Sequence, residues 1–110
     1  MQKVSLPALM RRQLEIARDA SSGRNAQTVY GGHEHILRQT MVALRAGSEL
    51  HEHENPGEAT VQVLHGRVTL IANDVSWNGS PGDLMFVPDT RHTLKAVDES
   101  VVVLTVAKRP

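Results

Sequence analysis

Two histidines that flank a glutamate, His51 and His53, are the residues whose types and spacing best suit chemistry in this sequence. In an extended strand, side chains two residues apart project from the same face, so both imidazoles can converge on one ion. Neutral imidazole is a common ligand of divalent transition metals, and the pair therefore indicates a candidate metal site. The alternative is a solvated strand, because the surrounding segment 48–54 also carries glutamates.

The composition narrows the chemistry that the rest of the chain can supply. It contains no cysteine, which excludes disulfides, thiolate metal sites and cysteine nucleophiles. Its 12 basic and 12 acidic side chains cancel, so the chain lacks the broad positive surface of a general nucleic-acid or membrane binder. No nucleophile elbow, phosphate-binding loop or carboxylate pair is recognisable. A metal held by imidazoles, or a ligand bound without catalysis, is what remains.

A single, mostly β domain must position the histidines, since 110 residues fit the usual domain size of roughly 100–200 residues. Ser5 can cap a helix over residues 5–20, whose apolar positions recur at helical steps. Beyond it, short apolar runs between turn formers predict strands at 27–30, 36–44, 50–53, 59–64, 67–72, 75–77, 84–87, 92–96 and 101–106. We therefore expect an all-β, antiparallel barrel or jelly roll over residues 26–110, with the helix and link of residues 1–25 packed on its outside.

A wider pattern of glycines, histidines and a proline surrounds the histidine pair. In chain order its members are Gly47, His51, His53, Gly66, Gly82, Pro88 and His92. The pattern resembles the two sequence motifs of the cupin superfamily over about residues 40–106. The resemblance implies a cupin-type β-barrel in which His51, His53 and His92 meet inside the barrel mouth. There they would hold one divalent transition metal, which could be iron, nickel, manganese, copper or zinc.

The acidic ligand is the first departure from the family pattern. Glu58 follows His53 at the family's usual distance, but seven residues separate it from Gly66 where six are usual. Ala59 occupies the position with the usual spacing. If Ala59 faces inward, strand alternation sends Glu58 outward unless a bulge re-aims it, so we expect Glu58 to be at most a distant fourth metal ligand.

The second departure lies before the last histidine of the pattern. Four residue steps link Pro88 to His92, where the family usually uses five. The shorter loop is tight, yet an imidazole at the start of the following strand is still expected to point inward. The alternative for His92 is a hydrogen-bonded barrel histidine with no metal.

The remaining histidines and one arginine have weaker patterns. His33 and His35 repeat the same alternation outside the motifs. They could approach the barrel mouth or pair with a neighbouring protomer, but we expect them to be solvated. His65 sits in a hairpin turn and should be exposed. Arg38 could hold a substrate carboxylate if its strand lines the cavity; otherwise it lies on an outer face.

Two classes of function fit these residues. A metal with open positions could polarise an oxygen-rich substrate, activate water or bind dioxygen, as in a dioxygenase- or isomerase-like enzyme of unknown reaction. The alternative is a non-catalytic module that binds or senses a small ligand without metal. Metal content of the purified protein would discriminate between them.

The expected partners are a small molecule and a second copy of the chain. One helix and a neutral charge argue against direct nucleic-acid binding. The chain shows neither the apolar core of a secretion signal nor the ~18 apolar residues needed to span a bilayer, so we expect no membrane contact and a cytoplasmic location. The apolar helical stripe and long strands exceed what a small barrel covers, and small cupins commonly pair, so we expect a homodimer.

Overall fold

The computed structural model describes residues 2–52 and 57–108. Within these ranges the chain forms α1 (Leu6–Asp19), β1 (Arg24–Tyr30), β2 (Leu37–Leu44), β3 (Glu49–Glu52), β4 (Gly57–His65), β5 (Val68–Ala72), β6 (Val75–Gly79), β7 (Leu84–Phe86), β8 (His92–Ala96) and β9 (Ser100–Lys108). Each predicted strand overlaps one of these, and the prediction of an all-β fold with an N-terminal helix is confirmed. No helix among the described residues has the length and hydropathy needed to cross a bilayer.

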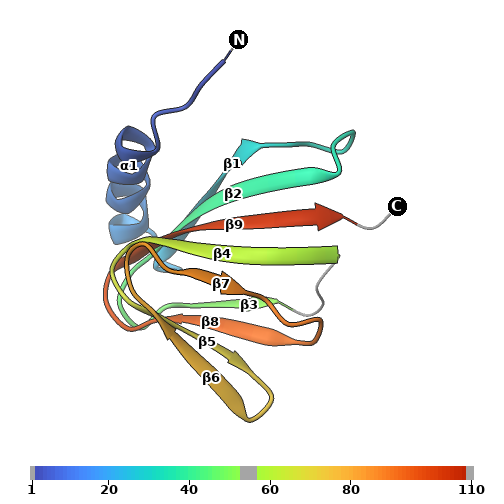
Figure 1. Cartoon of the computed structure of the whole chain (residues 1–110). Helices are drawn as coiled ribbons and strands as arrows, with labels where there is room; N and C mark the ends of the chain where they lie inside the picture. The colour runs from blue at the N-terminus through green and yellow to red at the C-terminus, as the bar shows by residue number, and fades with distance from the viewer. Residues whose placement is uncertain (1, 53–56, 109–110) are drawn as a thin grey trace.

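The strands form two antiparallel sheets that face each other. One sheet has the order β1-β2-β9-β4-β7 and the other the order β3-β8-β5-β6. In Figure 1 the sheets lie close together near α1 and diverge toward the side where the C-terminus lies. Their facing sides bury the main apolar core, which includes Val42, Leu44, Val61, Val63, Leu70, Leu94 and Val102. This arrangement is the predicted jelly-roll sandwich.

Helix α1 covers the outer face of the five-stranded sheet. Ser5 caps it by accepting a hydrogen bond from the amide of Ala8 at 3.4 Å. On the buried side of the helix, Leu14 and Ala17 pack into a second apolar cluster with Met41, Ala43, Val101 and Val103. Strands β2 and β9 are therefore apolar on both faces beneath the helix.

The C-terminal end of α1 is also fixed by charged side chains. Nη2 of Arg18 donates a hydrogen bond to Oε2 of Glu99 at 3.0 Å, and Nε of Arg18 contacts the other oxygen of the same carboxylate. This hydrogen-bonded guanidinium lowers the pKa of Glu99. Arg45 donates to the carbonyl oxygens of Arg18 and Ala20 at 3.1 and 3.2 Å. These hydrogen bonds connect the C-terminal end of α1 to the loop after β2 and to the loop between β8 and β9.

Candidate functional site

Glu58 can reach the barrel interior only if its side chain lies on the inner face of β4. Val61 and Val63 are buried in the core between the sheets, and Ala59 packs against that core. Glu58 lies on the opposite face of β4 and is exposed, paired in register with Ala107 of β9. The alternation expected from Ala59 is thus present, and the acidic side chain lies outside the barrel.

His92 lies at the start of β8 on the inner face of its sheet. It is 8% exposed and alternates with Leu94 and Ala96, which are both in the core. Its Nδ1 lies 3.0 Å from the carbonyl oxygen of Thr90. Because a carbonyl oxygen can only accept, Nδ1 carries the proton, and Nε2 of the neutral ring is left as an acceptor or ligand. The short loop before β8 contains Thr90 and therefore also orients the imidazole of His92.

His51 lies on the other face of the same sheet. The register of β3 and β8 pairs Leu50 with Leu94, whose side chains both pack in the core, and pairs His51 with Thr93. The His51 side chain is 62% exposed. Its Nε2 lies 3.0 Å from Oε2 of Glu49 and its Nδ1 lies 3.3 Å from Oγ1 of Thr93. The structure thus does not bring His51 and His92 together.

The predicted ligand set extends beyond the described residues. His53 lies outside them, and within residues 2–52 and 57–108 no group of three or more His, Cys, Asp or Glu side chains could hold an ion. A site that uses both His51 and His92 would need β3 to shift by one residue against β8, since such a shift exchanges the two faces of a strand. The three-histidine site with Glu58 stays a prediction.

Arg38 is a site residue that the sequence left undecided. In the register of β2 and β9 it pairs with Val106, and the next pairs on the same face are Thr40 with Leu104 and Val42 with Val102. Val42 and Val102 belong to the core between the sheets, so Arg38 shares the inner face. Gln39 lies on the outer face, where it donates to Oγ1 of Thr105 at 3.2 Å.

Arg38 and His92 lie at the same end of the barrel. Val106, the partner of Arg38, also pairs with Ala59 near the start of β4. The carbonyl oxygen of Ala59 accepts a hydrogen bond at 3.0 Å from the amide of Val87, which begins the segment leading to His92. A guanidinium and an imidazole are therefore placed on the inner faces of the two opposing sheets, near one opening.

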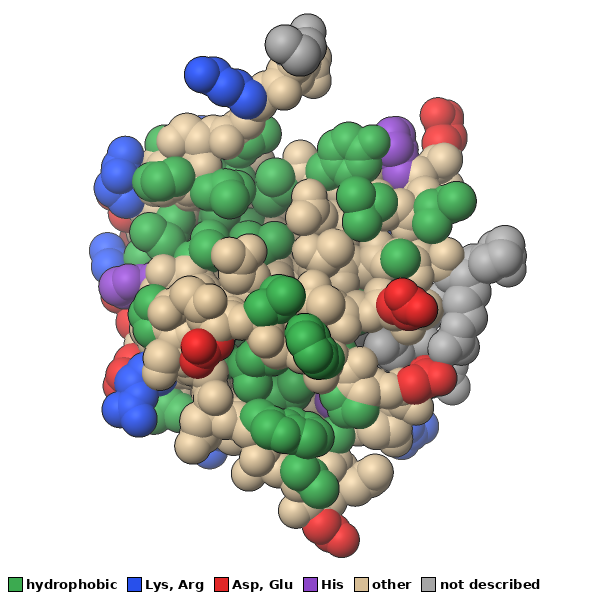
Figure 2. Space-filling model, in the orientation of Figure 1, with side chains coloured by type: hydrophobic (Ala, Val, Ile, Leu, Met, Phe, Trp, Pro, Cys, Tyr) green, Lys and Arg blue, Asp and Glu red, His purple; other side chains and the backbone are tan. Residues whose placement is uncertain are grey.

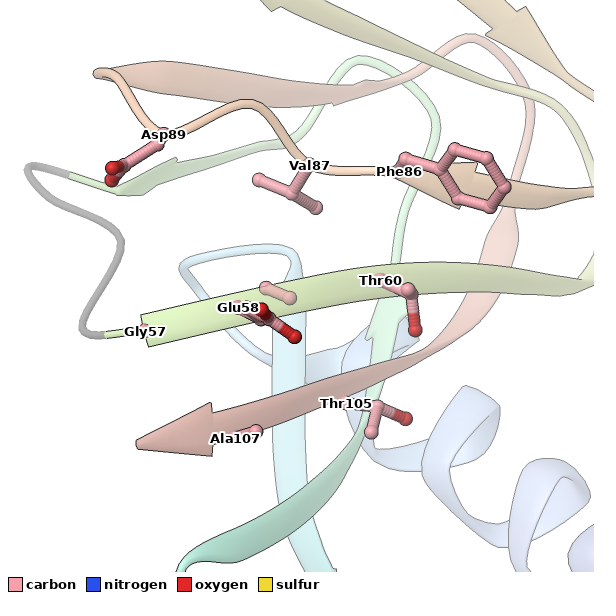
Figure 3. Close-up of a pocket in the computed structure, with 9 residues that line it drawn as sticks. Gly57, Glu58, Thr60, Phe86, Val87, Asp89, Thr105 and Ala107 are labelled. Atoms are coloured by element: carbon pink, nitrogen blue, oxygen red, sulfur yellow. The ribbon is translucent and has the colours of Figure 1, made fainter. Parts of the chain in front are cut away.

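A cavity lies beside this opening, and His92 is not among the residues that line it. It has a volume of about 500 Å³ and is lined by Gly57, Glu58, Ala59, Thr60, Phe86, Val87, Asp89, Thr105 and Ala107. Figure 3 shows Glu58 and Thr60 on β4, with Val87 and Asp89 on the segment facing them. Most of the lining belongs to the outer face of the five-stranded sheet. We therefore place the candidate site by the inward side chains and not by this cavity.

The other three histidines lie on the surface of the molecule. His33, His35 and His65 are exposed, as expected. The ring of His35 packs edge-on against Tyr30, with ring centroids 5.2 Å apart and planes at 79°. Among the described residues, none of the three forms a hydrogen bond or an ion pair with Arg38 or His92.

No protein-family model matches the chain. No curated protein matches its sequence. Solved structures do match. A cupin superfamily protein from Desulfitobacterium hafniense has a TM-score of 0.76 at 14% identity, covering 99% of this chain and 94% of that chain. KdgF from Halomonas sp. has a TM-score of 0.67 at 22% identity, covering 83% and 86%.

In a third solved structure, this chain matches only part of a longer chain. Salicylate 1,2-dioxygenase from Pseudoaminobacter salicylatoxidans has a TM-score of 0.72 at 20% identity, covering 92% of this chain and 31% of that chain. At such identities the likeness concerns the fold, and a fold hosts many activities. The chain has the cupin fold that its sequence motifs predicted.

Proposed function

We propose that this protein is a cupin that binds a small organic carboxylate at the end of the barrel where Arg38 and His92 lie. The observation that carries the proposal is the position of Arg38. Its guanidinium shares the inner face with core residues and has no hydrogen-bond or ion-pair partner among the described residues. A guanidinium is matched by a carboxylate, which accepts two of its N–H groups at once.

His92 suggests a second group on the ligand. With Nδ1 donating to Thr90, the neutral imidazole offers Nε2 as an acceptor. A hydroxyl on the ligand would donate to it. A hydroxy acid therefore matches both side chains, with its carboxylate at Arg38 and its hydroxyl at His92, and neither contact requires a metal.

Ligand-observed NMR with matched probes tests this function. We expect mandelate to bind. Mandelamide should bind more weakly because it lacks the negative charge, and phenylacetate should bind more weakly because it lacks the hydroxyl. Arg38→Gln should weaken mandelate binding roughly tenfold or more, since a hydrogen bond to a charged group contributes about 1.5–3 kcal/mol. Arg12→Gln, on the exposed side of α1, is the matched control and should leave binding unchanged.

Two results would contradict the proposal. One is equal binding of mandelate and mandelamide by the unmodified protein. The other is unchanged mandelate binding in Arg38→Gln. Absence of binding for mandelate and for smaller hydroxy acids such as glycolate and lactate would remove the proposal as well.

The second candidate function is the metal-dependent enzyme predicted from the histidine pattern. The contact from His92 to Thr90 favours it, because metal-binding histidines commonly donate their other ring N–H to a backbone carbonyl. In this reading His51, His53 and His92 hold one divalent transition metal, and a small-molecule substrate approaches it. The reading requires a different face of β3 from the one described.

Elemental analysis separates the two candidates. Protein purified without a histidine tag is incubated with each of the five metals, dialysed at neutral pH and analysed. One ion per chain, lost in His92→Ala and in His53→Ala but retained in His65→Ala, would support the metal site. Metal-free protein that still binds mandelate would support the carboxylate site alone.

A further inference from the structure

A groove lies where the sandwich opens between β6 and β7. These are the edge strands of the two sheets, and among the described residues β6 pairs only with β5 and β7 only with β4. The groove has a volume of about 410 Å³ and is lined by Leu70, Trp77, Asn78, Asp83, Leu84, Met85 and Phe86. Neither Arg38 nor His92 is among them, so this edge groove is separate from the site proposed above.

Apolar side chains form most of the edge groove. Leu70 and Met85 are almost fully buried, at 1% and 8% exposure. Trp77 pairs with Leu70 across β5 and β6 and so shares its face, but it is 46% exposed because no further strand covers it. Leu84 and Phe86 are 55% and 77% exposed. Figure 2 shows the apolar side chains gathered over β6 and β7 in the lower half of the view.

The polar end of the edge groove is negative. Asp83 is the one charged side chain among the lining residues described, and its Oδ2 accepts a hydrogen bond from the amide of Ser80 at 2.8 Å. Asn78 accepts through Oδ1 from Oγ1 of Thr69 at 3.0 Å. One hydrogen bond leaves most of the acceptor capacity of a carboxylate unused. The lining therefore presents a carboxylate with no cation facing it.

We infer that the edge groove binds a small arylalkylamine in its protonated form. The apolar part of the amine lies against Trp77, Leu84 and Phe86, and the ammonium lies at Asp83. Aromatic faces attract a cation, and a carboxylate hydrogen-bonds to it, so the charge of this ligand complements the whole lining. A volume of about 410 Å³ falls within the range of small-molecule sites, roughly 300–1,000 Å³.

Fluorescence of Trp77 reports directly on this groove, because Trp77 is the only tryptophan in the chain. Phenylbutylamine is the probe, and phenylbutanol is the uncharged control of nearly the same shape. We expect the amine to shift the emission of Trp77 in a saturable way. We expect phenylbutanol to need at least a tenfold higher concentration for the same shift.

Asp83→Asn is the decisive variant, because asparagine removes the charge and retains an oxygen that can accept from Ser80. It should lower the affinity for phenylbutylamine about tenfold, to that of phenylbutanol. Asp74→Asn, in the exposed turn between β5 and β6, is the matched control and should bind the amine as the unmodified chain does. Thermal unfolding of both variants verifies that they are folded.

Three outcomes would overturn the inference. The first is an equal response to the amine and the alcohol. The second is unchanged amine affinity in Asp83→Asn. The third is an emission shift that follows protein concentration without any amine, which would mean that a second copy of the chain occupies the groove. Arg38→Gln should bind the amine normally, so the two proposed sites succeed or fail independently.

Discussion

Replacing Gly66 with alanine should destabilise the fold more than replacing Gly47, although both glycines belong to the same sequence pattern. Both residues have positive φ, +77° at Gly66 and +86° at Gly47. A side chain in the left-handed region costs roughly 1–2 kcal/mol. A Cβ at Gly47 would meet no atom within 4 Å. For Gly47→Ala we therefore expect a loss of about 1–2 kcal/mol from backbone strain alone.

The surroundings of Gly66 add a second cost. A Cβ there would lie 2.8 Å from Cα of Ser100 and closer still to Oγ of Ser100 and the carbonyl oxygen of Glu99. Ser100 is fully buried, and its hydroxyl hydrogen-bonds to the carbonyl oxygens of Asp98 at 2.7 Å and Arg67 at 3.0 Å. Moving this backbone would break those contacts, at about 1–3 kcal/mol for buried groups left unpaired. The total for Gly66→Ala is about 2–5 kcal/mol.

Thermal and urea unfolding followed by circular dichroism measure both variants. At about 4 °C for each kcal/mol in a domain of this size, Tm should fall by about 4–8 °C for Gly47→Ala and about 8–20 °C for Gly66→Ala. A stability of about 5–15 kcal/mol leaves Gly66→Ala folded or marginal at low temperature. Equal losses in the two variants would refute the steric argument, since backbone conformation would then account for everything.

Three further predictions concern charge, metal and assembly. Because Arg18 lowers the pKa of Glu99, the ion pair should stabilise the fold at neutral pH, with the effect lost as pH falls below the usual glutamate value of about 4.3 and through the lowered one. Glu99→Gln should thus lower Tm at neutral pH and leave it unchanged in strong acid. If the protein takes up metal, Glu58→Ala should retain as much as the unmodified chain in elemental analysis, because Glu58 lies outside the barrel. Light scattering of the purified protein at micromolar concentration should give the mass of a dimer, and a monomer mass would contradict this expectation.

The candidate site shows which parts of a structure a sequence can predict. The alternation of β4 could be predicted because Ala59, Val61 and Val63 are apolar and share the face that the core covers. Glu58 therefore falls on the opposite face, outside the barrel. The same logic applies to β3, where Leu50 is the apolar residue of the segment. Once Leu50 takes the core, His51 must face outward. The histidine spacing suggested convergence, but hydrophobic burial of one leucine decides the face.

Arg38 illustrates a limit that has a physical origin. Further along the same strand, Met41 to Leu44 are all buried, because α1 covers one face of β2 and the opposite sheet covers the other. A run covered on both sides has no alternation, so the strand by itself cannot say which face Arg38 takes. The answer comes from β9, where pairing of Arg38 with Val106 continues the row of Val42 with Val102. Pairing between distant strands thus places the guanidinium of Arg38 on an inner face at the same end of the barrel as His92. A ligand anion is the group that would pair with it.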